Sequence, residues 1–68
     1  MIVAVGTKIW AWVVKPGMIV RTEDGTQIEV EKIHEGYDTI TYDNTVRKVT
    51  VRYSDSVEVL GYFNPENS

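Results

Sequence analysis

The sequence contains no cysteine and a single histidine among its 68 residues. Without cysteine the chain has no disulfide bond, no thiolate nucleophile and no cysteine-based zinc site. With one histidine, zinc sites built from pairs of imidazoles are excluded as well. We therefore expect the protein to hold no metal ion and no cofactor.

Long apolar runs are also missing. The longest covers residues 9–14, far short of the roughly 20 residues that a membrane-spanning helix needs. The apolar residues 1–5 are too few for the core of a signal peptide, and they lack a basic flank. These absences predict a cytoplasmic protein with no membrane partner.

Positive charge is scarce. Seven Lys and Arg residues stand against ten Asp and Glu residues, which gives a net charge of −3. Nucleic-acid binding depends on clustered cations that neutralise phosphates, so this balance argues against nucleic acid as the main partner. The acidic residues concentrate in the middle third of the chain, where they would steer and select a partner.

A chain of this length forms one domain with a small core. Such a domain buries only about 60% of the surface that its unfolded chain exposes. In the absence of disulfides and metals, tight closure of a β-sheet or self-association remains available to stabilise it. We therefore expect that an exposed apolar surface can serve to join copies of the chain.

Two glycine-containing pairs divide the stretch 13–30. Pro16-Gly17 predicts a turn, because proline fixes its own φ and glycine tolerates positive φ. Asp24-Gly25 lies between two apolar segments and predicts a two-residue hairpin turn with positive φ at its centre. The stretch therefore predicts a strand, a turn, a strand, a hairpin and a strand.

Alternation of apolar and polar residues predicts short strands throughout the chain. A change of spacing after Val30 predicts a bulge or bend near Glu31-Lys32, a feature that small barrels use to close. Short strands with at most one helical turn, at 54–57, predict an all-β barrel over residues 1–63 and a flexible tail at 64–68. The expected strands are 7–14, 18–22, 26–34, 39–42, 46–53 and 57–63, with 1–5 as a short edge strand or terminal arm.

The same alternation predicts the core, because a period of two places alternate residues on one face of a strand. The face expected to point inward is the more apolar one on each strand. Its members are Ile9, Ala11, Val13, Met18, Val20, Ile28, Val30, Ile33, Ile40, Val49, Val51, Val57 and Val59.

One part of the chain resembles a known family. Residues 15–20, 24–25 and 28–33 read Lys-Pro-Gly-Met-Ile-Val, Asp-Gly and Ile-Glu-Val-Glu-Lys-Ile. This pattern resembles the start of small prokaryotic and phage SH3-like barrels, including the KOW-type segments of ribosomal and transcription-elongation proteins. The resemblance implies a five- to six-stranded SH3-like barrel with tight turns and no substantial helix. The stretch is acidic where RNA-binding KOW segments are basic, so the resemblance implies a fold and no activity.

Trp10 and Trp12 are the strongest candidates for a binding site. Two residues apart on one expected strand, they share the face opposite the inward residues. Exposed tryptophans are enriched at the hot spots of protein interfaces. If the first and last strands adjoin, Leu60 and Tyr62 extend this surface. The alternative is that both indoles belong to the core.

The predicted function is a non-enzymatic protein-binding module, a small regulatory or phage-type protein that occupies the surface of a partner. Two alternatives remain open. In the first, the exposed tryptophan face joins copies of a self-assembling structural subunit. In the second, a small basic face contacts nucleic acid or the ribosome through Tyr42, Arg47, Lys48 and Arg52.

No catalytic motif is present in the sequence. It contains no nucleophile elbow, no glycine-rich phosphate loop and no serine–histidine–aspartate pattern. His34 beside Glu35, with Glu29 and Glu31 on the same expected strand, is the arrangement that most suggests metal or acid–base chemistry. An exposed histidine in a turn is the simpler interpretation, and we expect no catalysis.

Overall fold

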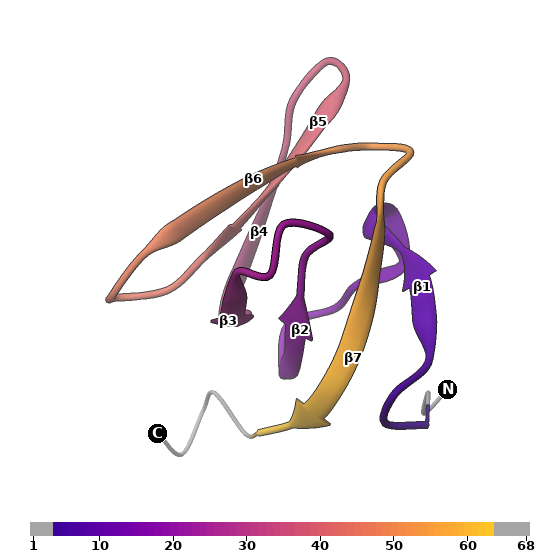
Figure 1. Ribbon diagram of the computed structural model, residues 1–68. Helices are drawn as coiled ribbons and strands as arrows, with labels where there is room; N and C mark the ends of the chain where they lie inside the picture. The colour runs from indigo at the N-terminus through magenta and orange to yellow at the C-terminus, as the bar shows by residue number, and fades with distance from the viewer. Residues whose placement is uncertain (1–3, 64–68) are drawn as a thin grey trace.

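The computed structural model describes residues 4–63 and is all-β, as the sequence predicts (Figure 1). Within these residues, seven strands form two antiparallel sheets. The first sheet has the order β1-β7-β2-β3, and the second has the order β4-β5-β6. A 3-10 helix, η1, follows β1, and the bounds are β1 Lys8–Trp10, η1 Ala11–Val13, β2 Met18–Arg21, β3 Gln27–Glu29, β4 Lys32–Glu35, β5 Thr39–Asp43, β6 Lys48–Arg52 and β7 Ser56–Tyr62.

The strand count exceeds the predicted five to six because the expected strand 26–34 is divided in two. The N–H of Glu31 donates to the carbonyl of Asp43, although Lys32 is the residue paired with Asp43. Two residues opposite one make a bulge, as the change of spacing predicted. The bulge ends β3 in the first sheet and starts β4 in the second. Within residues 4–63, strand pairing leaves the two sheets separate and does not close a barrel.

The Pro16-Gly17 turn leads the chain into β2. The N–H of Met18 donates to the carbonyl of Lys15 at 3.2 Å, and Gly17 has a φ of +99°. Proline at the second position and a positive φ at the third are typical of a type II turn. This turn is confirmed.

The β2–β3 hairpin has a loop of three residues rather than the predicted two-residue turn. Gly25 has a φ of +93°, as expected, but Asp24 does not have positive φ. The N–H of Thr22 bonds to the carbonyl of Thr26 at 2.8 Å, which leaves Glu23, Asp24 and Gly25 as the loop. A turn followed by a left-handed glycine is the next most common hairpin connection.

The core lies between the two sheets and consists largely of the predicted inward residues. Four of these, Ile9, Ile33, Val49 and Val51, are partly buried and pack against its edge. The fully or almost fully buried apolar residues are Ala11, Val14, Met18, Val20, Ile28, Val30, Ile40, Tyr42, Val57 and Val59.

One error in the predicted core follows from η1. The expected strand 7–14 ends at Trp10, where the chain turns into the 3-10 helix. Strand alternation stops there, so Val14 is buried and Val13 is only half-buried, the reverse of the prediction.

Tyr42 joins the second sheet to η1 through the core. Its side chain is 0% exposed, and its hydroxyl donates to the carbonyl of Ala11 at 2.7 Å. Burial, and to a smaller extent the charge of Asp55, raises the pKa of the Tyr42 phenol well above its usual value. Burial therefore favours the neutral hydroxyl that donates this hydrogen bond.

The ends of the chain are described in part. Residues 1–3 of the predicted arm and the predicted tail 64–68 lie outside the described residues. Residues 4–7 form a turn rather than a strand, in which the N–H of Thr7 donates to the carbonyl of Ala4. Within residues 4–63, no helix has the length and apolar character that a bilayer span requires.

Candidate partner-binding site

Backbone hydrogen bonds join three connecting segments at one end of the molecule: the β4–β5 turn, which is uppermost in Figure 1, the β6–β7 turn and η1. Ala11 of η1 donates its N–H to the carbonyl of Asp55 in the β6–β7 turn, 2.8 Å away. Tyr53 in the same turn donates its N–H to the carbonyl of Asp38 in the β4–β5 turn, 2.9 Å away. We name this end the aromatic end, after the exposed aromatic residue that each of the three segments carries: Trp12, Tyr37 and Tyr53.

Trp12 and Tyr53 form a stacked pair at the aromatic end. Their ring centroids are 6.1 Å apart, and their planes differ by 11°. Stacking leaves 47% of Trp12 and 46% of Tyr53 exposed. An offset stack of this kind contributes about 0.5–1.5 kcal/mol beyond the area that it buries. The pair is therefore an ordered apolar surface in contact with solvent.

Trp10 and Trp12 do not share the face of one strand, so that prediction is wrong. Trp10 is the last residue of β1, opposite Ser56, whereas Trp12 lies in η1. The strand period therefore does not relate the directions of the two indoles. Trp10 is 53% exposed, so neither indole belongs to the buried core.

A groove of about 380 Å³ runs beside Trp12. It lies between β4 and the segment that leads from η1 to Pro16. Apolar walls with a few charged groups are typical of binding grooves. Its main lining residues are Trp12, Val14 and Pro16 on one side and Ile33 and Ile40 on the other, with the charged Lys15 and Glu35.

Leu60 and Tyr62 do not extend the aromatic end. The first and last strands do adjoin, with Trp10 opposite Ser56, but Tyr62 lies six residues further along β7, about 20 Å away. A register shift leaves Leu60 as an extra residue and places Tyr62 opposite the buried Met18. The shift places Tyr62 on the same face as Met18, where Tyr62 is 42% exposed and lies at the far end of β7 from Trp10, so the predicted four-residue patch does not form.

The alternative nucleic-acid face is not formed as predicted. Tyr42 is fully buried and cannot stack on a base, because it shares the inward face of β5 with Ile40. Arg47 lies in the β5–β6 turn and donates to the carbonyl of Gln27 at 3.3 Å. Lys48 and Arg52 are exposed at the two ends of β6. The three cations lie at the surface without their predicted aromatic partner.

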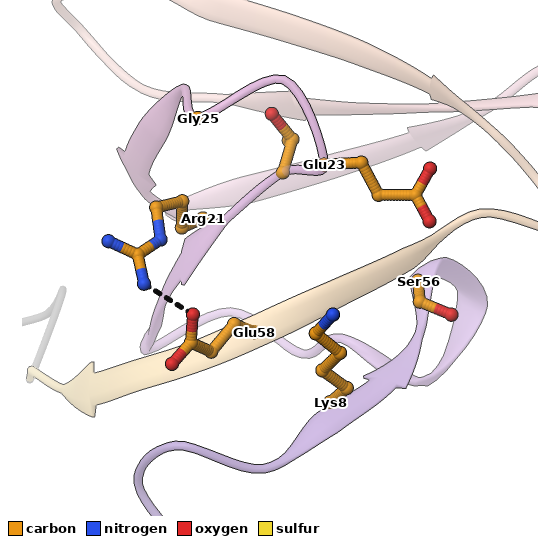
Figure 2. Close-up of a pocket in the computed structure, with 7 residues that line it drawn as sticks. Lys8, Arg21, Glu23, Gly25, Ser56 and Glu58 are labelled. Atoms are coloured by element: carbon orange, nitrogen blue, oxygen red, sulfur yellow. Dashed lines mark hydrogen bonds and ion pairs between the residues drawn. The ribbon is translucent and has the colours of Figure 1, made fainter.

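Figure 2 shows a charged recess of about 220 Å³ on the outer face of the first sheet. Glu58 on β7 forms an ion pair with Arg21 on β2, and Lys8 on β1 is its cross-strand neighbour on the other side. Opposite charges on neighbouring strands contribute about 0.2–1 kcal/mol each. Because these charges compensate one another, we interpret the recess as a stabilising feature of the sheet.

His34 lies on β4 rather than in a turn and is exposed. Its Nε2 lies 3.4 Å from Oδ2 of Asp43. The bulge at Glu31 separates β3 from β4, so Glu29 and Glu31 no longer share the face of one strand. In the part of the chain that the structure describes, no three His, Asp or Glu side chains gather in a way that could hold a metal ion.

Sequence reasoning missed the role of Tyr53. On the expected strand 46–53, the side chain of Tyr53 lies on the same face as those of Val49 and Val51. The strand instead ends at Arg52, whose N–H donates to Oδ2 of Asp55 at 3.0 Å. An aspartate that bonds to the backbone nearby is a turn signal, and Asp55 is the residue that could have indicated this earlier end.

Comparison with models of protein families, with curated proteins and with solved structures gave no match. The resemblance to KOW-type SH3-like barrels therefore rests on the sequence pattern alone. The interpretation of the aromatic end and its groove rests on their geometry.

Proposed function

We propose that the protein is a small binding module that recognises a partner protein through the aromatic end. The observation that carries this proposal is the Trp12–Tyr53 stack, which remains about half exposed beside a groove that six apolar and two charged residues line. Side chains that are already ordered lose little conformational entropy on binding, so more of their buried area contributes to affinity. Trp and Tyr are also the residue types most enriched at interface hot spots.

The proposed role is regulatory and non-enzymatic, and the protein acts by occupying the surface of its partner. The groove supports this role because it offers apolar contacts and one charge of each sign, rather than a nucleophile beside a general base. We further propose that the two sheets form a partly open SH3-like barrel. The pairing of β7 with both β1 and β2, and the bulge that carries the chain from one sheet to the other, support this description.

A displayed library of random 12-residue peptides tests the binding role. We expect selection on the wild-type protein to enrich peptides that bind the aromatic end. Trp12→Ala and Tyr53→Ala should each weaken binding of the enriched peptides by about 30-fold, which corresponds to about 2 kcal/mol for an aromatic anchor. Trp10→Ala is the matched control, because Trp10 is similarly exposed but lies outside the groove lining and the stack.

Two results would count against this function. Failure to enrich any peptide, or an equal loss of affinity in the Trp10→Ala control, would remove the aromatic end as the binding site. A wild-type dimer in sedimentation that Trp12→Ala converts to a monomer would instead favour the self-assembling alternative.

A further inference from the structure

The groove beside Trp12 runs along a free edge of the second sheet. Among the described strands, β4 pairs with β5 alone. Residues of an antiparallel pair alternate between exchanging hydrogen bonds with the partner strand and pointing their backbone groups away from it. The N–H of Gly36 donates to the carbonyl of Thr39, and this bond sets the alternation along β4. Ile33 and Glu35 therefore direct their N–H and C=O groups away from β5.

These free backbone groups coincide with the groove. Ile33 and Glu35 are the two β4 residues that line it, with Trp12 and Pro16 on the opposite wall. No turn or loop hydrogen bond within residues 4–63 uses the backbone of either residue. A strand edge with unpaired N–H and C=O groups is a template for a further strand.

We propose that the partner enters as an extended segment that adds to the free edge of β4 as a new strand. This inference rests on the proposed function and specifies how the same groove is filled. The segment carries an apolar side chain beside Ile33 and a basic side chain two positions away, beside Glu35. The spacing is two because Ile33 and Glu35 share one face of β4 and cross-strand neighbours share a face.

The chemistry of the groove selects that segment. Its apolar lining residues, among them Ile33 and Ile40, suit an apolar side chain, and Glu35 is exposed and forms no ion pair with residues 4–63. A basic side chain opposite Glu35 would gain a cross-strand charge pair and would lie close to the Trp12 ring, where a cation is attracted to the aromatic face.

The other free edges are less suited to receive a strand. On β1 the alternation leaves the backbone groups of Lys8 and Trp10 unpaired, but the recess that Lys8 lines at this strand is charged. The edge of β3 is covered, because Arg47 and Asn44 donate to the carbonyls of Gln27 and Glu29. On β6 the alternation of hydrogen bonding with β5 leaves the backbone N–H and C=O groups of Lys48 and Thr50 unpaired. A strand added there would meet the acidic β2–β3 loop. Among the described strands, the edge of β4 is therefore the one where free backbone groups meet a groove lined mainly by apolar residues.

Amide hydrogen exchange tests the proposal without any substitution. The probe is a peptide enriched on the wild-type protein, added to isotopically labelled monomer and followed by NMR. In the free protein, we expect the Ile33 and Glu35 amides to exchange rapidly and the His34 amide slowly. With the peptide bound, the Ile33 and Glu35 amides should become at least about tenfold slower, because each then donates to the added strand.

Proline at the two free edges provides a matched pair of variants. Glu35→Pro removes an N–H that points away from the sheet and should weaken peptide binding at least about tenfold more than Glu35→Gln, which removes the charge alone. Glu35→Gln should lower affinity about two- to fivefold. Thr50→Pro makes the same backbone change on β6 and should leave binding unchanged.

The outcomes separate this inference from the proposed function. Loss of binding in Trp12→Ala without slower exchange at Ile33 and Glu35 would retain the aromatic end as the site and overturn strand addition. Slower exchange at Lys48 and Thr50 would overturn the choice of edge. The proposed occupant would be overturned if no peptide is selected. It would also be overturned if the protein forms a dimer through its own β4 strands when the peptide is added.

Discussion

Two grooves flank the second sheet, one along each free edge, and they differ in the types of residue that line them. The groove along β4 is bounded by the segment from η1 to Pro16, and six of its eight lining residues are apolar in type. The groove along β6, of about 240 Å³, is bounded by the β2–β3 loop and the β6–β7 turn. Its lining includes three acidic residues: Glu23, Asp24 and Asp55.

The two walls are also held in place differently. Ala11 in η1 is buried, donates its N–H to Asp55 and accepts the Tyr42 hydroxyl, so this wall is tied to the core. The β2–β3 loop is held by its own residues, because Asp24 accepts the Thr22 hydroxyl and the Thr26 N–H. The difference teaches that a small domain can hold the wall of a binding groove in place through one buried hydroxyl from the opposite sheet. The β2–β3 loop, in contrast, is held by hydrogen bonds among its own residues.

Removing the Tyr42 side chain should have the largest effect. Tyr42→Ala deletes a fully buried aromatic ring, and we expect a loss of about 3–5 kcal/mol in the free energy of unfolding. Because small domains have only about 5 kcal/mol or slightly more to lose, the variant should be largely unfolded. Circular dichroism with thermal denaturation measures this.

Tyr42→Phe sharpens the same test. It keeps the ring and removes only the hydroxyl, which leaves the carbonyl of Ala11 buried without its donor. We expect a loss of about 1–3 kcal/mol and a retained cooperative transition. An unchanged denaturation midpoint would show that the η1 wall does not depend on this bond.

Gly25→Val tests the wall of the other groove. A β-branched residue at a φ of +93° should cost about 1–2 kcal/mol, and a Cβ at Gly25 meets no atom within 4 Å, so the cost is in the backbone alone. Urea denaturation measures it, with Gly25→Asn as the control, since asparagine tolerates positive φ better. A loss from Gly25→Val larger than that from Tyr42→Ala would reverse the comparison between the two walls.

A double-mutant cycle on Trp12 and Tyr53 should give a smaller effect. The single and double alanine variants should show a coupling free energy of about 0.5–1.5 kcal/mol in unfolding, because the stacked rings contact each other. The same cycle on Trp10 and Tyr53 serves as the control, and its coupling should be within about 0.5 kcal/mol of zero. Equal coupling in both cycles would show that the stack is not a specific contact.

The acid dependence of stability should reveal the smallest effect. Hydrogen bonds from the Thr22 hydroxyl and the Thr26 N–H lower the pKa of Asp24 below its usual value. A carboxylate whose pKa is lower in the folded state stabilises the fold above its ordinary pKa, and this contribution is lost as pH falls through the lowered value. Urea midpoints measured from about pH 5 down to pH 2 should therefore fall less steeply in Asp24→Asn than in the wild type. If the urea midpoints of the two proteins fall equally steeply with pH, the Asp24 carboxylate does not contribute to the acid dependence of stability.

Much of the architecture could be predicted from the sequence. Strand alternation around Val20, Ile28 and Val57 identified residues that are buried, and the apolar spacing after Val30 indicated the bulge at Glu31. Pro16-Gly17 and Gly25 marked turns with positive φ. Each of these signals is local, because alternation and turn chemistry depend on residues within a few positions of one another.

The candidate site was predicted only in part. The sequence left open whether Trp12 is exposed or belongs to the core; Trp12 is 47% exposed, but its supposed neighbours Leu60 and Tyr62 lie elsewhere. The register shift in β7 changes which face Tyr62 occupies, and a shift of one residue moves a side chain to the other side of a sheet. Such a shift is a property of the pairing between strands and leaves no clear trace in either segment.

By itself, the sequence determined that the chain forms short strands joined by tight turns around an aliphatic core, because backbone preferences and side-chain alternation act over short distances. The tertiary structure decided that the chain leaves β1 at Trp10 and that Tyr42 is buried under Ala11. It also decided that Trp12 stacks on Tyr53 and that the edge of β4 remains open beside an apolar groove. These features depend on contacts between residues about 30 to 40 positions apart, whose geometry is set only when the two sheets pack together.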